Sequence, residues 1–136
     1  MKKDVFVTIK TESFPKDDSP RHIMTNTKGT LFSGDGLLYI SYNENPKEFG
    51  KTLTKVKIKS DRVELIRTGN IVSRLVFCKD LPFEGMYNTP YGSLPVKINV
   101  TRLEINADEN SGTVKMEYNL DFAGDITENK FTLKYN

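Results

Sequence analysis

The sequence has little of the residue types that most often mark a catalytic or metal site. Among its 136 residues there is one cysteine, Cys78, one histidine, His22, and no tryptophan. A single cysteine excludes an internal disulfide and favours a reducing compartment. A zinc site built on one histidine would need acidic ligands, and no spacing of Asp or Glu indicates one. We therefore expect no metal or other cofactor, and no Cys-His nucleophile.

Long apolar runs and an excess of charge of one sign are missing as well. No apolar stretch reaches the roughly 20 residues that a membrane-spanning helix needs. The apolar start of the chain is interrupted at Lys10, before the core of a signal peptide is complete. Its 20 Lys and Arg against 18 Asp and Glu leave a net charge of +2, too small to indicate a polyanion partner. These features predict a cytoplasmic protein that binds neither nucleic acid nor membranes.

What the sequence does have is a recurring alternation of apolar and polar residues, which is typical of half-buried strands. Turn residues separate the alternating segments, and Pro90 and Gly92 occupy the second and fourth positions of a type I turn that marks a hairpin. For residues 44–50 the alternatives are one short turn of helix and a plain loop, of which Pro46 and Gly50 favour the loop. The predicted strands are 4–12, 21–32, 37–43, 52–59, 62–67, 71–79, 85–88, 93–105 with a β-bulge, 113–122 and 129–135.

About ten short strands with short connections indicate an all-β fold, an antiparallel closed meander β-barrel, since closure removes exposed sheet edges. The length of 136 residues and the absence of a linker predict a single domain. Side-chain alternation then assigns an inner and an outer face to each strand. The expected core is Phe32, Leu38, Ile40, Val56, Ile58, Val63, Leu65, Met116, Leu120, Phe122, Phe131 and Leu133.

The same alternation places charged and polar residues inside the barrel. With Ile40 inward, Tyr42 and Glu44 also face inward, and with Leu65 inward, so does Arg67. Burying charge is costly unless the charge is paired or meets a ligand or water. The fixed donor fork of Arg67 suits an anionic or polar ligand. The alternative is that Arg67 only pairs with Glu44 or extends into water at the barrel mouth.

The hairpin at residues 87–92 supplies three further candidates, because loops at barrel mouths often carry function. Tyr87, Thr89 and Tyr91 would join the inner cluster if this hairpin covered the opening. The alternative is a turn that serves backbone shape alone. The predicted ligand-binding set is therefore Tyr42, Glu44, Arg67, Tyr87, Thr89 and Tyr91, with no catalytic and no metal-binding residue.

Four segments together resemble a known family. They are Tyr39-Ile40-Ser41-Tyr42-Asn43-Glu44, Ile66-Arg67-Thr68-Gly69, Tyr87-Asn88-Thr89-Pro90-Tyr91-Gly92 and Gly112-Thr113-Val114-Lys115-Met116-Glu117-Tyr118. Their order and spacing resemble the YwiB-like family of small uncharacterised bacterial proteins with a calycin-like (lipocalin-like) β-barrel. This resemblance covers essentially the whole chain and implies a closed barrel whose function is unassigned.

The sequence thus favours a non-enzymatic protein that binds a small, partly apolar ligand in its barrel. The alternative is a protein-interaction or structural module whose barrel is filled by side chains and whose working surface is outside. Leu53, an apolar residue among outward lysines, is the one sign of such a surface, and a homodimer is left open. An enzyme would need a catalytic cluster, and no pattern indicates one.

Overall fold

A computed structural model describes all 136 residues and shows an all-β chain with ten strands and one short helix. The strands and the helix are β1 (Lys2–Pro15), β2 (Arg21–Gly34), β3 (Leu37–Asn43), α1 (Pro46–Phe49), β4 (Thr52–Ile58), β5 (Arg62–Gly69), β6 (Val72–Cys78), β7 (Phe83–Thr89), β8 (Gly92–Ala107), β9 (Gly112–Phe122) and β10 (Asp125–Tyr135). Each predicted strand is present, most of them a few residues longer. No helix in the chain is long and apolar enough to cross a bilayer.

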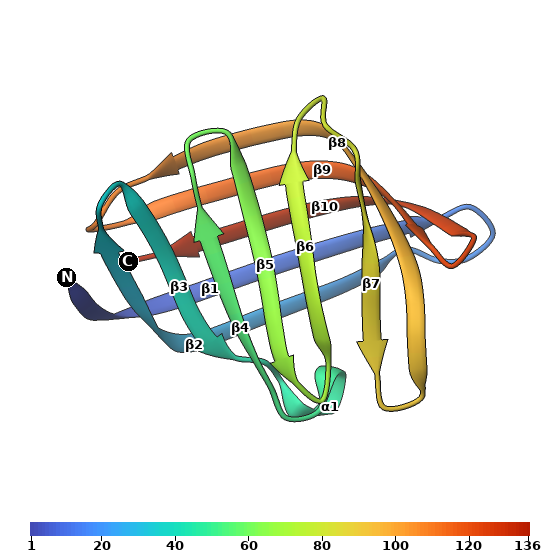
Figure 1. Cartoon of the computed structure of the whole chain (residues 1–136), viewed down its shortest axis with the longest axis horizontal. Coiled ribbons are helices and arrows are strands. Elements are labelled where there is room, and N and C mark those ends of the chain that lie inside the picture. The colour runs from blue at the N-terminus through green and yellow to red at the C-terminus, as the bar shows by residue number, and fades with distance from the viewer.

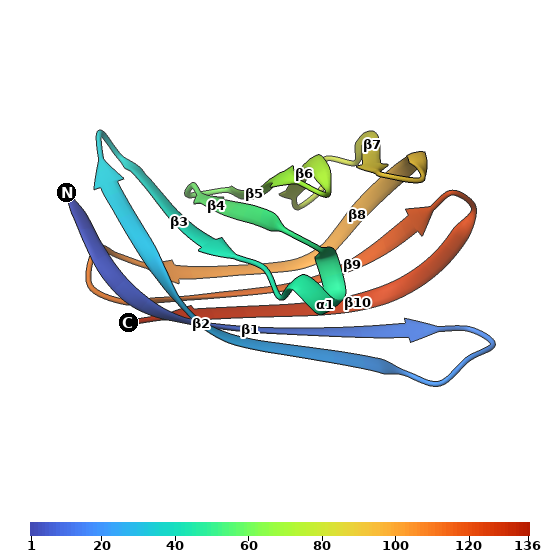
Figure 2. The same cartoon turned by 90° about the horizontal axis from the view of Figure 1, so that it is seen from below.

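The strands form a closed antiparallel meander, as the sequence predicts. Each strand pairs with its neighbours in the chain, and β1 pairs with β10 to close the barrel. Figure 1 shows β3 to β7 running steeply across β8, β9, β10, β1 and β2. Seen from below, in Figure 2, these two groups are the opposite walls of a flattened barrel. The interior therefore lies between two crossed layers of side chains.

The wall is uneven at two places. The β8–β9 register shifts between Val100 and Arg102, which confirms the predicted bulge. The β6–β7 ladder is short, with only the pairs Val72–Asn88 and Ser73–Tyr87. Ser73 is thus one of the two β6 residues with a ladder partner on β7, and the rest of β6 has none on that side.

The core follows the alternation, with one error in the predicted set. Leu38, Leu120 and Phe122 are half-buried and pack against the core, whereas Phe32 lies on the outer wall. Its ring stacks on Tyr39, with 4.6 Å between the centroids. On β2 the odd-numbered residues face inward, so Leu31 is fully buried in the place expected of Phe32. The predicted core residues that are buried are Ile40, Val56, Ile58, Val63, Leu65, Met116, Phe131 and Leu133.

Of the two alternatives for residues 44–50, the short helical turn is the one present, at Pro46–Phe49, and the favoured plain loop is wrong. The side chain of Asn45 caps this turn by accepting from the backbone N–H of Lys47 at 3.0 Å. Pro46 suits the first helical position, where its missing N–H leaves no bond unmade. The turn matters for the interior because it brings Phe49 to the end of the barrel where Glu44 lies.

Candidate functional site

Tyr42, Glu44 and Arg67 face the interior and meet there. Tyr42 is on β3, Glu44 follows the end of that strand, and Arg67 is on β5. Thr54 of β4 lies between them, since it is the register partner of Tyr42 on one side and of Arg67 on the other. The side chains of Glu44 and Arg67 are only 4% and 12% exposed. Three neighbouring strands therefore bring one polar cluster into the barrel.

One carboxylate oxygen organises this cluster. Glu44 Oε2 accepts from Thr54 Oγ1 at 2.6 Å, from the Tyr42 hydroxyl at 3.3 Å and from Arg67 Nε at 3.4 Å. The Arg67 guanidinium also lies over the ring of Phe49, 5.0 Å from its centroid. A buried carboxylate with a cation and two hydroxyl donors avoids most of the cost of an unpaired charge.

Beside the cluster lies a cavity of about 180 Å³. It is smaller than the roughly 300–1,000 Å³ of pockets for drug-sized ligands. Its walls are mainly aliphatic and aromatic, and Glu44 and Arg67 are the charged residues in its lining. The lining consists of Ile9, Thr11, Ile23, Thr25, Tyr42, Glu44, Phe49, Leu65, Arg67, Leu75, Phe77, Tyr87, Val96, Tyr118, Leu120, Phe122 and Phe131. The cavity is therefore apolar apart from the Glu44–Arg67 pair and the hydroxyls of its threonines and tyrosines.

Several polar groups around the cavity keep hydrogen-bonding capacity that the protein does not use. Within the protein, Arg67 bonds through Nε and Glu44 through Oε2, which leaves both Nη atoms of Arg67 and Oε1 of Glu44 without partners. The hydroxyls of Tyr87 and Tyr118 have no protein partner, although both residues line the cavity. The unused capacity of these cavity-lining groups is available to a ligand. Ser73 Oγ also has no partner, but it is fully buried and Ser73 is not among the residues that line the cavity.

The sequence assigned neither Tyr118 nor Ser73 to a site. Tyr118 lines the cavity, whereas Ser73 does not line it but pairs in the ladder with two residues that do. Alternation along β6, where Leu75 and Phe77 line the cavity, places Ser73 on the inner face. Ser73 is 5% exposed and is the register partner of Arg67 on β5 and of Tyr87 on β7. Tyr118 alternates with Met116 and Leu120 on the inner face of β9, and the packing of the opposite walls brings it to the cavity.

The predicted hairpin residues separate into two groups. Tyr87 lines the cavity and packs edge-on against Phe122, with 5.3 Å between the ring centroids. Thr89 is engaged in the turn, where its Oγ1 donates to the carbonyl of Gly92 and accepts from the N–H of Tyr91. Tyr91 is fully exposed at the tip. Thr89 and Tyr91 lie outside the cavity lining, so the hairpin is not a cover for this site.

Burial keeps the phenols of the site protonated. Desolvation raises the pKa of Tyr42 far above its ordinary value, and the Glu44 carboxylate raises it further. The pKa of Tyr87 is raised by burial and lowered in part by Arg67. The pKa of Tyr118 is raised by burial to about 12. These side chains are therefore hydrogen-bond donors at neutral pH, not anions.

The raised pKa of Tyr118 predicts a loss of stability at alkaline pH. The unfolded phenol ionises from about pH 10, whereas the folded phenol stays neutral up to about pH 12, so the free energy of unfolding falls between these values. Tyr118→Phe lacks this contribution. Between pH 7 and pH 11 its free energy of unfolding should therefore fall by about 1 kcal/mol less than that of the wild type. Urea unfolding at pH 7 and pH 11 measures the difference. Equal losses in both proteins would contradict the burial of this hydroxyl.

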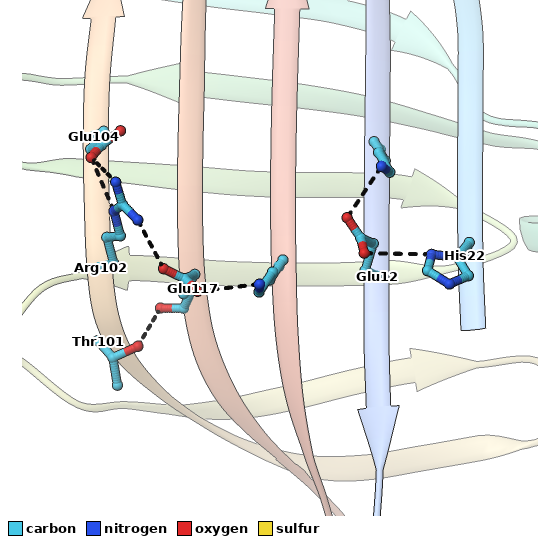
Figure 3. A network of polar contacts seen from close by, with 8 residues as sticks. Glu12, His22, Thr101, Arg102, Glu104 and Glu117 are labelled. Carbon is cyan, nitrogen blue, oxygen red and sulfur yellow. Dashed lines mark hydrogen bonds and ion pairs between the residues drawn. The ribbon is translucent and has the colours of Figure 1, made fainter. Parts of the chain in front are cut away.

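Other polar features lie on the outer wall. Figure 3 shows Arg102 between Glu104 and Glu117, and Glu12 beside His22, with 3.6 Å between Glu12 Oε2 and His22 Nδ1. These exposed pairs contribute little to stability or chemistry. Cys78 is a buried free thiol. Across the whole chain, no group of three His, Cys, Asp or Glu side chains is arranged to hold a metal ion.

A larger hollow of about 600 Å³ lies on the outer wall, open to solvent. Phe6, 65% exposed, and the half-buried Leu53 contribute its apolar part, and Asp4 and Lys28 its charges. This hollow is more open than the interior cavity and has no hydrogen-bonded cluster like the one around Glu44. We therefore take the interior cavity as the candidate site.

Comparison with known proteins supports this fold and assigns no activity. The computed structure resembles the crystal structure of ywiB protein from Bacillus subtilis, with a TM-score of 0.89 and 21% sequence identity, over 99% of this chain and 92% of the other. A search of curated proteins finds no match. A family model described as "Domain of unknown function (DUF1934)" matches residues 7–134. The expected resemblance to YwiB-like proteins is thus confirmed, and the chain belongs to the DUF1934 family.

Proposed function

We propose that this protein is a non-enzymatic cytoplasmic binding protein that holds one small, partly apolar molecule inside its barrel. The observation that carries the proposal is the interior cavity of about 180 Å³, which is lined mainly by apolar side chains together with Glu44 and Arg67. Closed barrels of similar size, including the lipocalins, hold one small ligand in this way. Apolar walls with a few convergent polar groups are the usual composition of a ligand site.

The cavity favours this proposal over an interaction module with a filled barrel. In a filled barrel, the side chains would use the available space and pair the polar groups among themselves. Here a cavity remains between the walls, and the Nη atoms of Arg67 and Oε1 of Glu44 have no partner within the protein. Phe6 and Leu53 are the apolar residues of the outer hollow on which an interaction surface there would depend, and other apolar side chains such as Met24 are exposed elsewhere.

Native mass spectrometry of protein purified gently from its own host tests for a molecule retained in the barrel. A thermal-shift panel of small aromatic amides, acids, alcohols and ketones tests binding directly, because a ligand that binds only the folded state raises Tm. We expect at least one uncharged member of the panel to raise Tm. A panel without any stabilising compound, together with protein that retains no molecule, would contradict the proposal.

Leu75→Phe tests whether binding takes place in the cavity. Leu75 lines it, so the added ring atoms occupy space that a ligand needs, and we expect binding to be lost. Val72→Phe is the matched control, since Val72 is on the same strand but is 47% exposed on the outer face. Leu120→Phe, on β9, fills the cavity from another wall and repeats the test if the first variant folds poorly. Unchanged binding in both cavity variants would place the ligand elsewhere.

A further inference from the structure

We infer that the molecule bound in the barrel carries an uncharged carboxamide-type group, held by Arg67 and Glu44 together, and that Glu44 selects against carboxylates. This inference rests on the proposed function and adds the chemical class of the ligand. It depends on three features of the site: its charge balance, its unused hydrogen-bonding groups and its walls.

The charge balance of the cavity argues against an anionic ligand. Glu44 and Arg67 are the charged residues among those that line it, and they pair with each other at 3.4 Å. The lining is therefore neutral before any ligand binds. A carboxylate would place a second negative charge near Glu44 in a poorly solvated space, where one cation would have to balance both. An uncharged polar group avoids this cost.

The unused hydrogen-bonding groups match a group that both accepts and donates. The Nη atoms of Arg67 offer N–H donors, and Oε1 of Glu44 offers an acceptor, none of them bonded within the protein. A carboxamide presents a carbonyl oxygen for Arg67 and an N–H for Glu44. A carboxylate has acceptors alone, so its second oxygen would face the Glu44 carboxylate without a proton between them.

The walls indicate the rest of the ligand. Aromatic rings from three strands, those of Phe77, Phe122 and Phe131, line the cavity together with aliphatic side chains. Such walls favour a flat or compact apolar body, through burial and edge-to-face ring contacts. At about 180 Å³ the cavity suits a body of about one aromatic ring.

Benzamide and benzoate test the inference, since they share one ring and one shape and differ in charge. Isothermal titration of the full chain at pH 7 should give an affinity at least roughly tenfold higher for benzamide than for benzoate. In Glu44→Gln the positive charge of Arg67 is unbalanced, so we expect the affinity for benzoate to rise by at least roughly tenfold and the preference to reverse. Glu48→Gln, which removes an exposed acid on α1, is the control and should leave the wild-type preference unchanged.

The outcomes separate this inference from the proposed function. Benzoate binding as tightly as benzamide to the wild type, no binding of benzamide, or an unchanged preference in Glu44→Gln would each overturn the inference. The wild-type comparison decides the matter even if Glu44→Gln folds poorly. If another compound of the panel still binds in a way that Leu75→Phe abolishes and Val72→Phe does not, the proposed function survives the failure of the inference.

Discussion

Arg67→Met is expected to lower the free energy of unfolding by about 3–5 kcal/mol at pH 7, because it leaves the Glu44 carboxylate buried without its cation. The Glu44 side chain is 4% exposed, and Arg67 is the basic residue paired with it. Methionine keeps most of the volume and apolar stem of arginine, so the loss of packing is small. Urea unfolding, followed by circular dichroism, measures the change.

The double variant Arg67→Met/Glu44→Gln should recover most of that loss, since a neutral amide needs no cation and can still accept from Thr54 and Tyr42. Arg102→Met is the matched control, because Arg102 pairs with Glu104 and Glu117 on the exposed outer wall. We expect it to cost less than about 1 kcal/mol. If Arg67→Met proved as mild as Arg102→Met, the buried ion pair would be excluded as a feature of the folded protein.

Gly69→Ala is expected to destabilise the fold by at least about 2 kcal/mol, through backbone strain and a clash. Gly69 ends β5 with a φ of +121°, a conformation that side-chain-bearing residues rarely adopt. A Cβ there would lie 2.3 Å from the carbonyl oxygen of Lys51 and 3.1 Å from the Cα of Thr52, both of them backbone atoms that cannot rotate away. Thermal unfolding should show a clear fall in Tm.

Gly34→Ala is the control for Gly69→Ala. Gly34 ends β2, its backbone does not have a positive φ, and no atom outside its chain neighbours lies within 4 Å of a Cβ built there. Alanine at this position should be neutral or stabilise by up to about 1 kcal/mol, because it restricts the unfolded chain. A similar fall in Tm in both variants would mean that the backbone geometry at the end of β5 does not require glycine.

The strands and the polar cluster could be predicted because the fold is a meander with one inner face. In such a barrel the alternation along each strand shows directly which side chains face inward. Because Ile40 and Leu65 face inward, Glu44 and Arg67 do so as well. The rule failed at Phe32, where β2 carries too few apolar residues to set its own phase. There the pairing of Leu31 with Ile40 decides which residues face inward.

Alternation alone could not predict where the hairpin candidates lie or that a cavity is present. Thr89 is the last residue of β7 and Tyr91 lies beyond it. Alternation does not show at which residue a strand stops lining the interior. Alternation also could not predict that the β6–β7 ladder is short or that Ser73 Oγ has no bonding partner, because both are properties of the folded chain. A cavity is the volume that packing leaves unfilled, so only the assembled walls define it.

The most direct test of a ligand site inside the barrel is a benzamide titration followed by the ¹H–¹⁵N NMR signal of Arg67 Nε–H, which lies beside the cavity and donates to Glu44. We expect this signal and the backbone signals of Ser73 and Tyr87 to shift together with one saturating curve. Shifts confined to Phe6, Lys28 and Leu53 would place the ligand in the outer hollow and contradict an interior site.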